Sequence, residues 1–117
     1  DVRILDATWF LPGEARTGRQ AYDSAHIPGA RFFDIDDIAD TDSALPHMLP
    51  RPEKFASRAR RMGLGDGHRI VCYDQNDYLA SARVWWMFRA MGHGDVSVLD
   101  GGFNAWKGVG GPLEDLP

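Results

Sequence analysis

Three scarcities in the sequence each exclude a class of protein. A single cysteine among 117 residues rules out disulfides within the chain, and a lone thiol is typical of a reducing compartment such as the cytoplasm. No apolar run approaches the roughly 18 residues that a membrane-spanning helix needs. Basic residues are not in excess, because 13 of them face 17 acidic ones and the net charge is −4. We therefore expect a cytoplasmic domain that binds neither membrane nor nucleic acid.

The residue patterns of two further site types are also missing. The four histidines stand apart, without the paired Cys, His or carboxylate spacing that would hold a metal. Gly101 and Gly102 are not followed by Lys-Ser or Lys-Thr, so they do not form a phosphate-binding loop, and a strand-to-helix turn explains them. We expect no metal site.

Apolar residues make up 44% of the chain, an ordinary globular value, and the length suits one domain. Short apolar runs predict strands at 2–7, 30–33, 70–73 and 96–99, and helical patterns fall at 19–24, 52–62, 80–91 and 103–107. This alternation predicts an α/β fold, a small central parallel sheet with helices on both faces. Residues 34–39 have the character of a helix start. We expect a domain at 1–110 and the start of a linker at 111–117.

The stretch from Ile70 to Met91 has the layout of an active site. A buried strand ends at a polar loop, and a helix starts after the loop. Ligands of parallel sheets bind at the carboxyl ends of the strands, where loop N–H groups and a helix amino end favour an anion. The loop that opens with Asp74 is therefore where chemistry is expected.

The residues in this stretch do not match its layout. Cys72, the only thiol, lies inside the expected strand between Val71 and Tyr73, which predicts a buried and inert core residue. The alternative, a nucleophile displaced along the strand, would require the strand to end early. We interpret Asp74 as a structural anchor of the loop and not as a catalytic acid or base.

Several segments, in order, resemble rhodanese-like domains, and in particular the N-terminal domain of two-domain 3-mercaptopyruvate and thiosulfate sulfurtransferases. The resemblance extends over nearly the whole chain. The segments are His26-Ile-Pro-Gly-Ala30, Phe33-Asp-Ile-Asp36, His47-Met-Leu-Pro50, Arg83-Val-Trp-Trp-Met-Phe-Arg89 with Gly92-His93, and Val98-Leu-Asp-Gly-Gly-Phe-Asn-Ala-Trp106.

This resemblance implies a rhodanese-like fold and a parent enzyme with two such domains in tandem. The second domain would hold the Cys nucleophile that becomes a persulfide, and the first would be catalytically silent. Asp74 stands where an active domain has that Cys, and a carboxylate cannot form a persulfide. The resemblance thus implies no catalytic residue within this domain and no cofactor.

Asp36 and His47 become site candidates only through the resemblance. Taken alone, Asp36 could cap a short helix near Ile35, and His47 could be an exposed loop residue. In mercaptopyruvate-type enzymes the matching Asp and His face the active site of the partner domain, where the Asp orients the His near a Ser. The resemblance implies that Asp36 and His47 line the substrate site.

The implied function is transfer of sulfane sulfur from 3-mercaptopyruvate or thiosulfate to a thiophilic acceptor such as cyanide or a thiol, through a catalytic second domain of the same chain. Two alternatives stay open, a stand-alone interaction module and an enzyme that acts through Cys72. The other candidates have structural interpretations. We expect His26 to bond to the backbone of its turn, Arg83 and Arg89 to pack their stems beside the tryptophans with ion pairing, and His93 to lie at a helix end.

Overall fold

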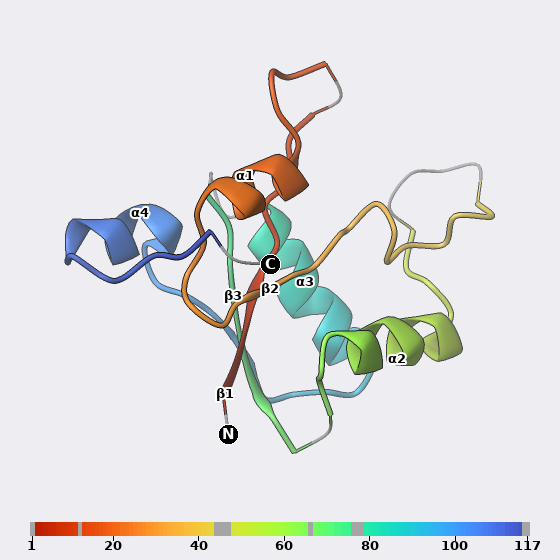
Figure 1. Ribbon diagram of the computed structural model, residues 1–117. Helices are drawn as coiled ribbons and strands as arrows, with labels where there is room; N and C mark the ends of the chain where they lie inside the picture. Colours follow the sequence, from red (N-terminus) through yellow and green to blue (C-terminus); the bar gives the residue numbers. More distant parts are fainter. Residues whose placement is uncertain (1, 12, 44–47, 66, 76–78, 116–117) are drawn as a thin grey trace.

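A computed structural model describes residues 2–11, 13–43, 48–65, 67–75 and 79–115, and these residues form a parallel sheet between helices (Figure 1). The strands are β1 (Val2–Asp6), β2 (Arg31–Phe32), β3 (Arg69–Tyr73) and β4 (Val96–Val98), in the order β2-β1-β3-β4. All neighbouring strands are parallel. Their carboxyl ends therefore meet at one edge of the sheet.

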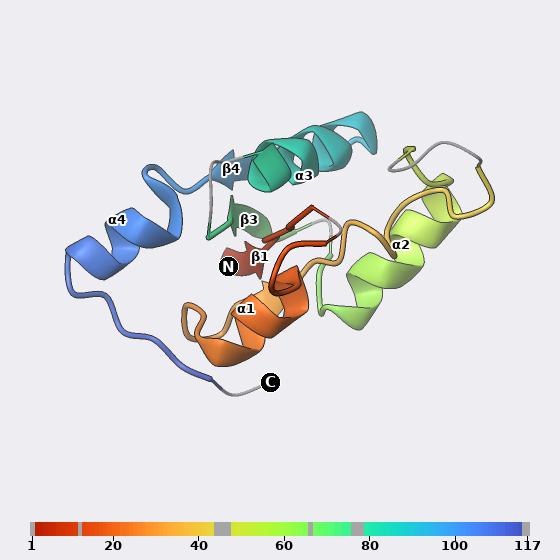
Figure 2. The ribbon, with the colours of Figure 1, turned by 90° about the horizontal axis from the view of Figure 1, so that it is seen from above.

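Helices cover both faces of this sheet (Figure 2). The helices α2 (Pro52–Arg61) and α3 (Leu79–Ala90) lie on one face, and α1 (Gly18–Ser24) and α4 (Gly102–Gly108) lie on the other. Two helix starts follow from the local sequence. The side chain of Thr17 and that of Gln20 each accept an N–H of the other residue at the start of α1, and Pro52 occupies the first turn of α2. The predicted α/β fold is confirmed.

The core has two parts, one on each face of the sheet. Under α2 and α3, the rings of Phe33, Phe55 and Phe88 meet with centroids 5.0 to 6.4 Å apart. Under α1 and α4, Tyr73 stacks on Phe103 at 5.7 Å. Strand β3 contributes to both parts, with Ile70 and Cys72 on one face and Tyr73 on the other, because alternate residues of a strand point to opposite faces.

Two elements differ from the expectation. Strand β2 covers only Arg31–Phe32, because the preceding Ala30 donates its N–H to Ile27 in a turn. Residues 34–39 form turns and no regular helix, and there Asp34, not Asp36, is the capping residue: its Oδ1 accepts the N–H groups of Asp36 and Asp37 at 3.0 and 3.4 Å. No helix in the described part of the chain is long and apolar enough to cross a membrane.

Candidate functional site

The site candidates lie at the sheet edge formed by the carboxyl ends of the strands. Trp9 follows β1, Asp36 follows β2, and Asp74 directly follows β3. The structure therefore brings together segments that are far apart in the sequence, as parallel topology requires.

A buried polar network fixes the loop after β3 to the end of β1. The fully buried carboxylate of Asp6 accepts the N–H and the hydroxyl of Thr8 at 2.9 and 2.6 Å. Gln75 donates its backbone N–H to the Thr8 hydroxyl at 3.0 Å and its side-chain amide to Asp6 Oδ2 at 3.1 Å. The same amide lies within reach of the carbonyls of Ala21 and Ala25. Hydrogen bonds to Thr8, to Asp6 and to carbonyls at the end of α1 thus fix Gln75 at the start of the loop, which suits a structural role.

Asp74 is 1% exposed, and its carboxylate faces into the domain. Its Oδ2 accepts the N–H of Ser81, in the first turn of α3, at 2.9 Å, and its backbone carbonyl accepts the N–H of Phe103 at 3.2 Å. A carboxylate at a helix amino end satisfies a free N–H group and complements the helix dipole. The anion-favouring position at the start of α3 is therefore occupied by the chain's own carboxylate.

Cys72 is fully buried within β3, opposite Leu5 of β1 and Val98 of β4. Burial raises the pKa of its thiol to about 12. Because the thiolate is the nucleophile, a thiol with this pKa stays protonated and unreactive near neutral pH. The expectation of a buried core cysteine is confirmed, and strand β3 continues past it to Tyr73.

Asp36 is exposed and is paired with a tryptophan that the sequence analysis did not single out. The indole Nε1 of Trp9 lies 3.2 Å from each carboxylate oxygen of Asp36. Trp9 itself packs against the core under α2 and α3. One fixed donor thus holds an exposed carboxylate in a set orientation. The sequence could have indicated Trp9, because Trp9 lies just past the predicted strand at 2–7, at the end of the sheet where ligands bind.

His47 lies outside the described residues, and so do residues 76–78 of the loop that starts at Asp74. The segment on either side of His47 is fixed at two points. Asp40 donates its N–H to the carbonyl of Met48 at 2.8 Å, and Lys54 of α2 donates to the carbonyl of Ala39 at 2.7 Å. The long loop is thus closed at its base and tied to α2, on the side of the sheet where Asp36 lies.

The remaining candidates have structural contacts. His26 is fully buried; its Nδ1 lies 2.7 Å from the carbonyl of Tyr22 and its Nε2 lies 3.2 Å from Glu114 Oε1. The guanidinium groups of Arg83 and Arg89 lie 4.9 and 5.1 Å from the ring centroids of Trp86 and Trp85. Backbone bonding of His26 and packing of both arginines on the tryptophans are confirmed. His93, just after α3, places its Nε2 2.9 Å from the carbonyl of His68.

The residues after α4 return to the domain. The indole N–H of Trp106 donates to the carbonyl of Pro112 at 2.8 Å. Glu114 exchanges backbone hydrogen bonds with His26, at 2.9 Å in each direction, and its carboxylate accepts the N–H of Gly29 at 2.8 Å. A linker start at residue 111 stays a prediction, but residues up to 114 contact the fold.

Among the hollows lined by described residues are two that include none of Trp9, Asp36 and Asp74. One, of about 460 Å³, lies between α2 and α3 around Phe55 and Phe88; the other, of about 400 Å³, lies beside the start of β1. Among the described residues, no three His, Cys, Asp or Glu side chains gather as a metal ion would require. At the candidate edge, the carboxylate of Asp36 is exposed and is held by Trp9.

Comparison with known proteins identifies this arrangement. Residues 1–108 match the family model of the rhodanese-like domain. The chain belongs to the rhodanese family. It is 47% identical over 114 residues to human 3-mercaptopyruvate sulfurtransferase, covering 96% of this chain and 38% of that protein. It is also 47% identical to mitochondrial thiosulfate/3-mercaptopyruvate sulfurtransferase 1 of Arabidopsis thaliana, covering 97% of this chain and 30% of that protein.

A solved structure of a relative also superimposes closely on this chain. SseA from Escherichia coli, solved as an example of the rhodanese fold of 3-mercaptopyruvate sulfotransferases, superimposes with a TM-score of 0.92 at 41% identity. That match covers 98% of this chain and 44% of SseA. This rhodanese domain therefore spans less than half the length of these relatives.

Proposed function

We propose that this chain is the N-terminal, non-catalytic rhodanese domain of a two-domain sulfurtransferase. The single observation that carries the proposal is the occupied position after β3, where the buried Asp74 carboxylate accepts the N–H of Ser81. A carboxylate there cannot carry sulfur, and the only thiol is buried and protonated. The sulfur-carrying thiolate must therefore come from a second domain, which is consistent with relatives more than twice the length of this chain.

The reaction we propose moves one sulfane sulfur from 3-mercaptopyruvate or thiosulfate to cyanide or a thiol. The Cys thiolate of the second domain attacks the thiol sulfur of 3-mercaptopyruvate or the outer sulfur of thiosulfate. The bond between that sulfur and the rest of the donor breaks, and the rest of the donor leaves with the electron pair. With 3-mercaptopyruvate, the leaving group takes up a proton to form pyruvate. The acceptor then attacks the outer sulfur of the persulfide and restores the thiolate. This cycle needs no external oxidant or reductant.

This domain would supply Asp36 and His47 to that proton transfer. The Trp9 indole fixes the Asp36 carboxylate from one side, and this carboxylate lies at the surface of the domain. A carboxylate in this setting can accept the N–H of a histidine and so fix the tautomer whose other nitrogen handles the proton. Asp36 is thus a positioning residue in the proposal, and His47 is the residue that exchanges the proton.

Replacing Asp36 by Asn in the full-length protein tests this role. The fold should be retained because Asp36 is exposed. We expect turnover with 3-mercaptopyruvate to fall by about a hundredfold, the lower range for loss of general acid–base assistance, and the pH profile of kcat to change. Asp37→Asn is the matched control, because Asp37 is also exposed but pairs with Arg58 of α2. Equal turnover in the two variants would contradict the role of Asp36.

A cytoplasmic location stays part of the proposal. It is supported by the single buried thiol, while the Arabidopsis relative is a mitochondrial protein. Fractionation of cells that express the full-length protein would decide between the two compartments.

A further inference from the structure

Helix α3 carries two stripes of mainly apolar residues at helical spacing. The inner stripe faces the core and is buried; it consists of Ala80, Ser81, Val84, Met87 and Phe88. The second, which we call the outer stripe, has the same spacing on the opposite side and is exposed; it consists of Ala82, Trp85, Trp86, Arg89 and Ala90. Exposed tryptophans opposite a buried apolar face are typical of a helix that is covered on both sides.

Helix α2, which lies on the same face of the sheet, shows the contrast. Its inward side packs Phe55 into the core, and its exposed positions include Glu53, Arg60 and Arg61. Those charges suit contact with water. On α3 the corresponding outward positions hold two tryptophans, two alanines and one arginine, so the outer stripe is less suited to contact with water than the exposed side of α2.

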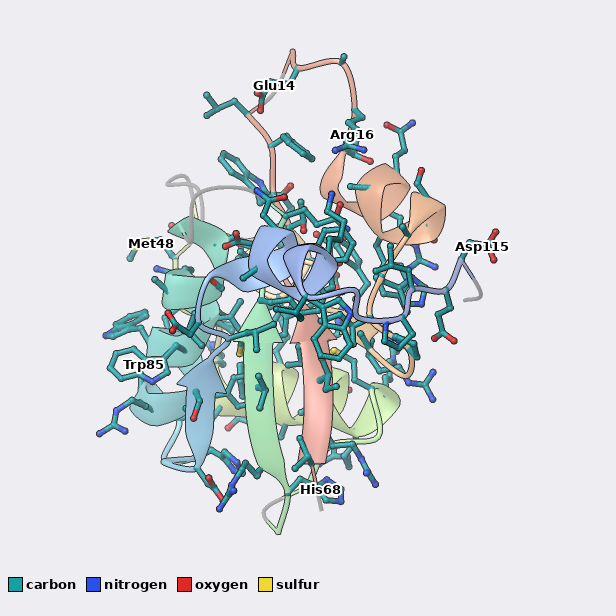
Figure 3. The ribbon with its side chains drawn as sticks, turned by 90° about the vertical axis from the view of Figure 1, so that its left-hand side faces the viewer. Glu14, Arg16, Met48, His68, Trp85 and Asp115 are labelled. Atoms are coloured by element: carbon teal, nitrogen blue, oxygen red, sulfur yellow. The ribbon has the colours of Figure 1, made fainter. Side chains whose placement is uncertain are left out.

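The tryptophans of the outer stripe are held in place. Trp85 is 38% and Trp86 46% exposed, and each ring is stacked by an arginine of the same helix. Figure 3 shows Trp85 pointing away from the sheet, on the same side of the molecule as the exposed Met48. Trp and Arg are the residues most enriched in binding hot spots. Side chains that are already ordered lose less entropy when a partner covers them.

We infer that the outer stripe of α3 is the surface on which the second domain of the same chain docks, an inference that rests on the proposed function. The occupant follows from the relatives: SseA superimposes on 98% of this chain and extends over more than twice its length. The position fits as well. Helix α3 begins beside Asp74, at the edge of the sheet that carries Asp36, so a domain seated on the stripe lies next to the proposed site residues.

The stripe also defines the chemistry of the surface that covers it. Two flat indole rings require an apolar counterpart. The guanidinium group of Arg89, which lies over the Trp85 ring, favours carboxylates or carbonyl oxygens at its rim. A second copy of this chain could also cover the stripe, but only in a dimer. Dilution to a monomer in the footprinting experiment detects that case.

Hydroxyl-radical footprinting of the full-length protein tests the docking directly. For each side chain, oxidation in the native protein is compared with oxidation in the unfolded chain. This domain alone leaves Trp85 38% and Trp86 46% exposed, which by itself gives about two- to threefold protection relative to the unfolded chain. We expect clearly stronger protection of both tryptophans in the full-length protein. Val109, 82% exposed, should show little protection and serves as the internal reference. Protection of both tryptophans no greater than that of this domain alone would overturn the inference, and so would protection that disappears on dilution to a monomer.

A double variant, W85Q/W86Q, gives the second measurement. Both side chains are exposed, so the domain itself should fold, while the full-length protein should show a larger radius of gyration in X-ray scattering and two unfolding transitions in place of one. Val2→Gln, which removes a half-exposed apolar side chain at the far end of β1, is the control. An unchanged scattering profile and a single transition in W85Q/W86Q would overturn the inference.

The outcomes separate the two proposals. Sulfur transfer by the full-length wild type with unprotected tryptophans supports the proposed function and overturns the docking surface. Protected tryptophans in a two-domain protein without sulfur transfer support the docking surface and overturn the proposed function. A full-length chain that contains no second rhodanese domain overturns both.

Discussion

Replacing Glu114 by Ala should destabilise the domain more than its position near the end of the chain suggests. The carbonyl of Tyr22 can only accept, so the His26 Nδ1 that lies 2.7 Å from it must carry a hydrogen. His26 Nε2 then faces the Glu114 carboxylate at 3.2 Å. Both nitrogens of the fully buried ring therefore lie beside an oxygen atom, and Glu114 is the side-chain partner of Nε2.

The magnitude follows from what the substitution leaves unpaired. A buried polar group without its partner costs about 1–3 kcal/mol. Glu114 is 28% exposed, so water can partly replace it as the partner of His26 Nε2. The N–H of Gly29 is exposed and can bond to water instead. We therefore expect Glu114→Ala to lower the free energy of unfolding by about 1–3 kcal/mol.

Urea unfolding followed by tryptophan fluorescence measures this change. Asp115→Ala is the matched control, because Asp115 is the next residue, is acidic and is exposed. Glu114→Gln should fall between the two, since it keeps an oxygen acceptor and loses the charge. If Glu114→Ala and Asp115→Ala are equally stable within about 0.5 kcal/mol, the range typical of surface substitutions, a stabilising contact between His26 and Glu114 is refuted.

Two further predictions concern titratable groups. Because burial raises the pKa of Cys72 to about 12, a thiol reagent should leave the native domain unlabelled at pH 8 and label it once urea unfolds it; rapid native labelling would show that the strand opens. A pKa raised on folding means that the unfolded chain ionises first, so the contribution of Cys72 to stability is complete below about pH 8.5 and is lost as pH rises. The hydrogen bond from Arg58 lowers the pKa of Asp37, so the stability from this pair is present above about pH 4 and is lost as pH falls through the lowered value. Asp37 is half exposed, so Asp37→Asn should remove only about 0.5 kcal/mol at neutral pH and nothing at the acid end; an equal loss at both ends would contradict the pairing.

The regular elements were predictable because local patterns specify them. The apolar runs around Ile70 and Val96 predict β3 and β4, and the spacing of Val84, Trp85, Phe88 and Met91 predicts α3, although Trp85 lies on its exposed side. Residues 34–39 were misjudged for a local reason as well. The Asp34 carboxylate accepts two successive N–H groups, which stabilises a turn at the place where an acidic segment suggested a helix.

The contacts that sequence reasoning missed are separated by long stretches of chain. Trp9 meets Asp36 across 27 positions, and His26 meets Glu114 across 88. No spacing rule connects such pairs, because the sheet topology and the course of the tail set them. The anchoring role of Asp74 was foreseen from its place after a strand, but its partner Ser81 depended on the start of α3. The roles of Asp36 and His47 in a substrate site stay predictions.

The docked tail has a consequence for the route of any chain that follows it. Figure 3 places Asp115 and Trp85 on opposite sides of the molecule, and Figure 2 shows the tail passing below α1 while α3 lies across the sheet. The domain measures 39 × 37 × 23 Å along its principal axes. At about 3.5 Å per extended residue, a chain that crosses even the shortest of these dimensions, 23 Å, needs about seven residues or more. A connection to a domain seated on α3 would therefore be a linker that runs along the surface of this domain, and not a short hinge. Proteolytic cleavage of such a linker would not by itself separate the docked domains.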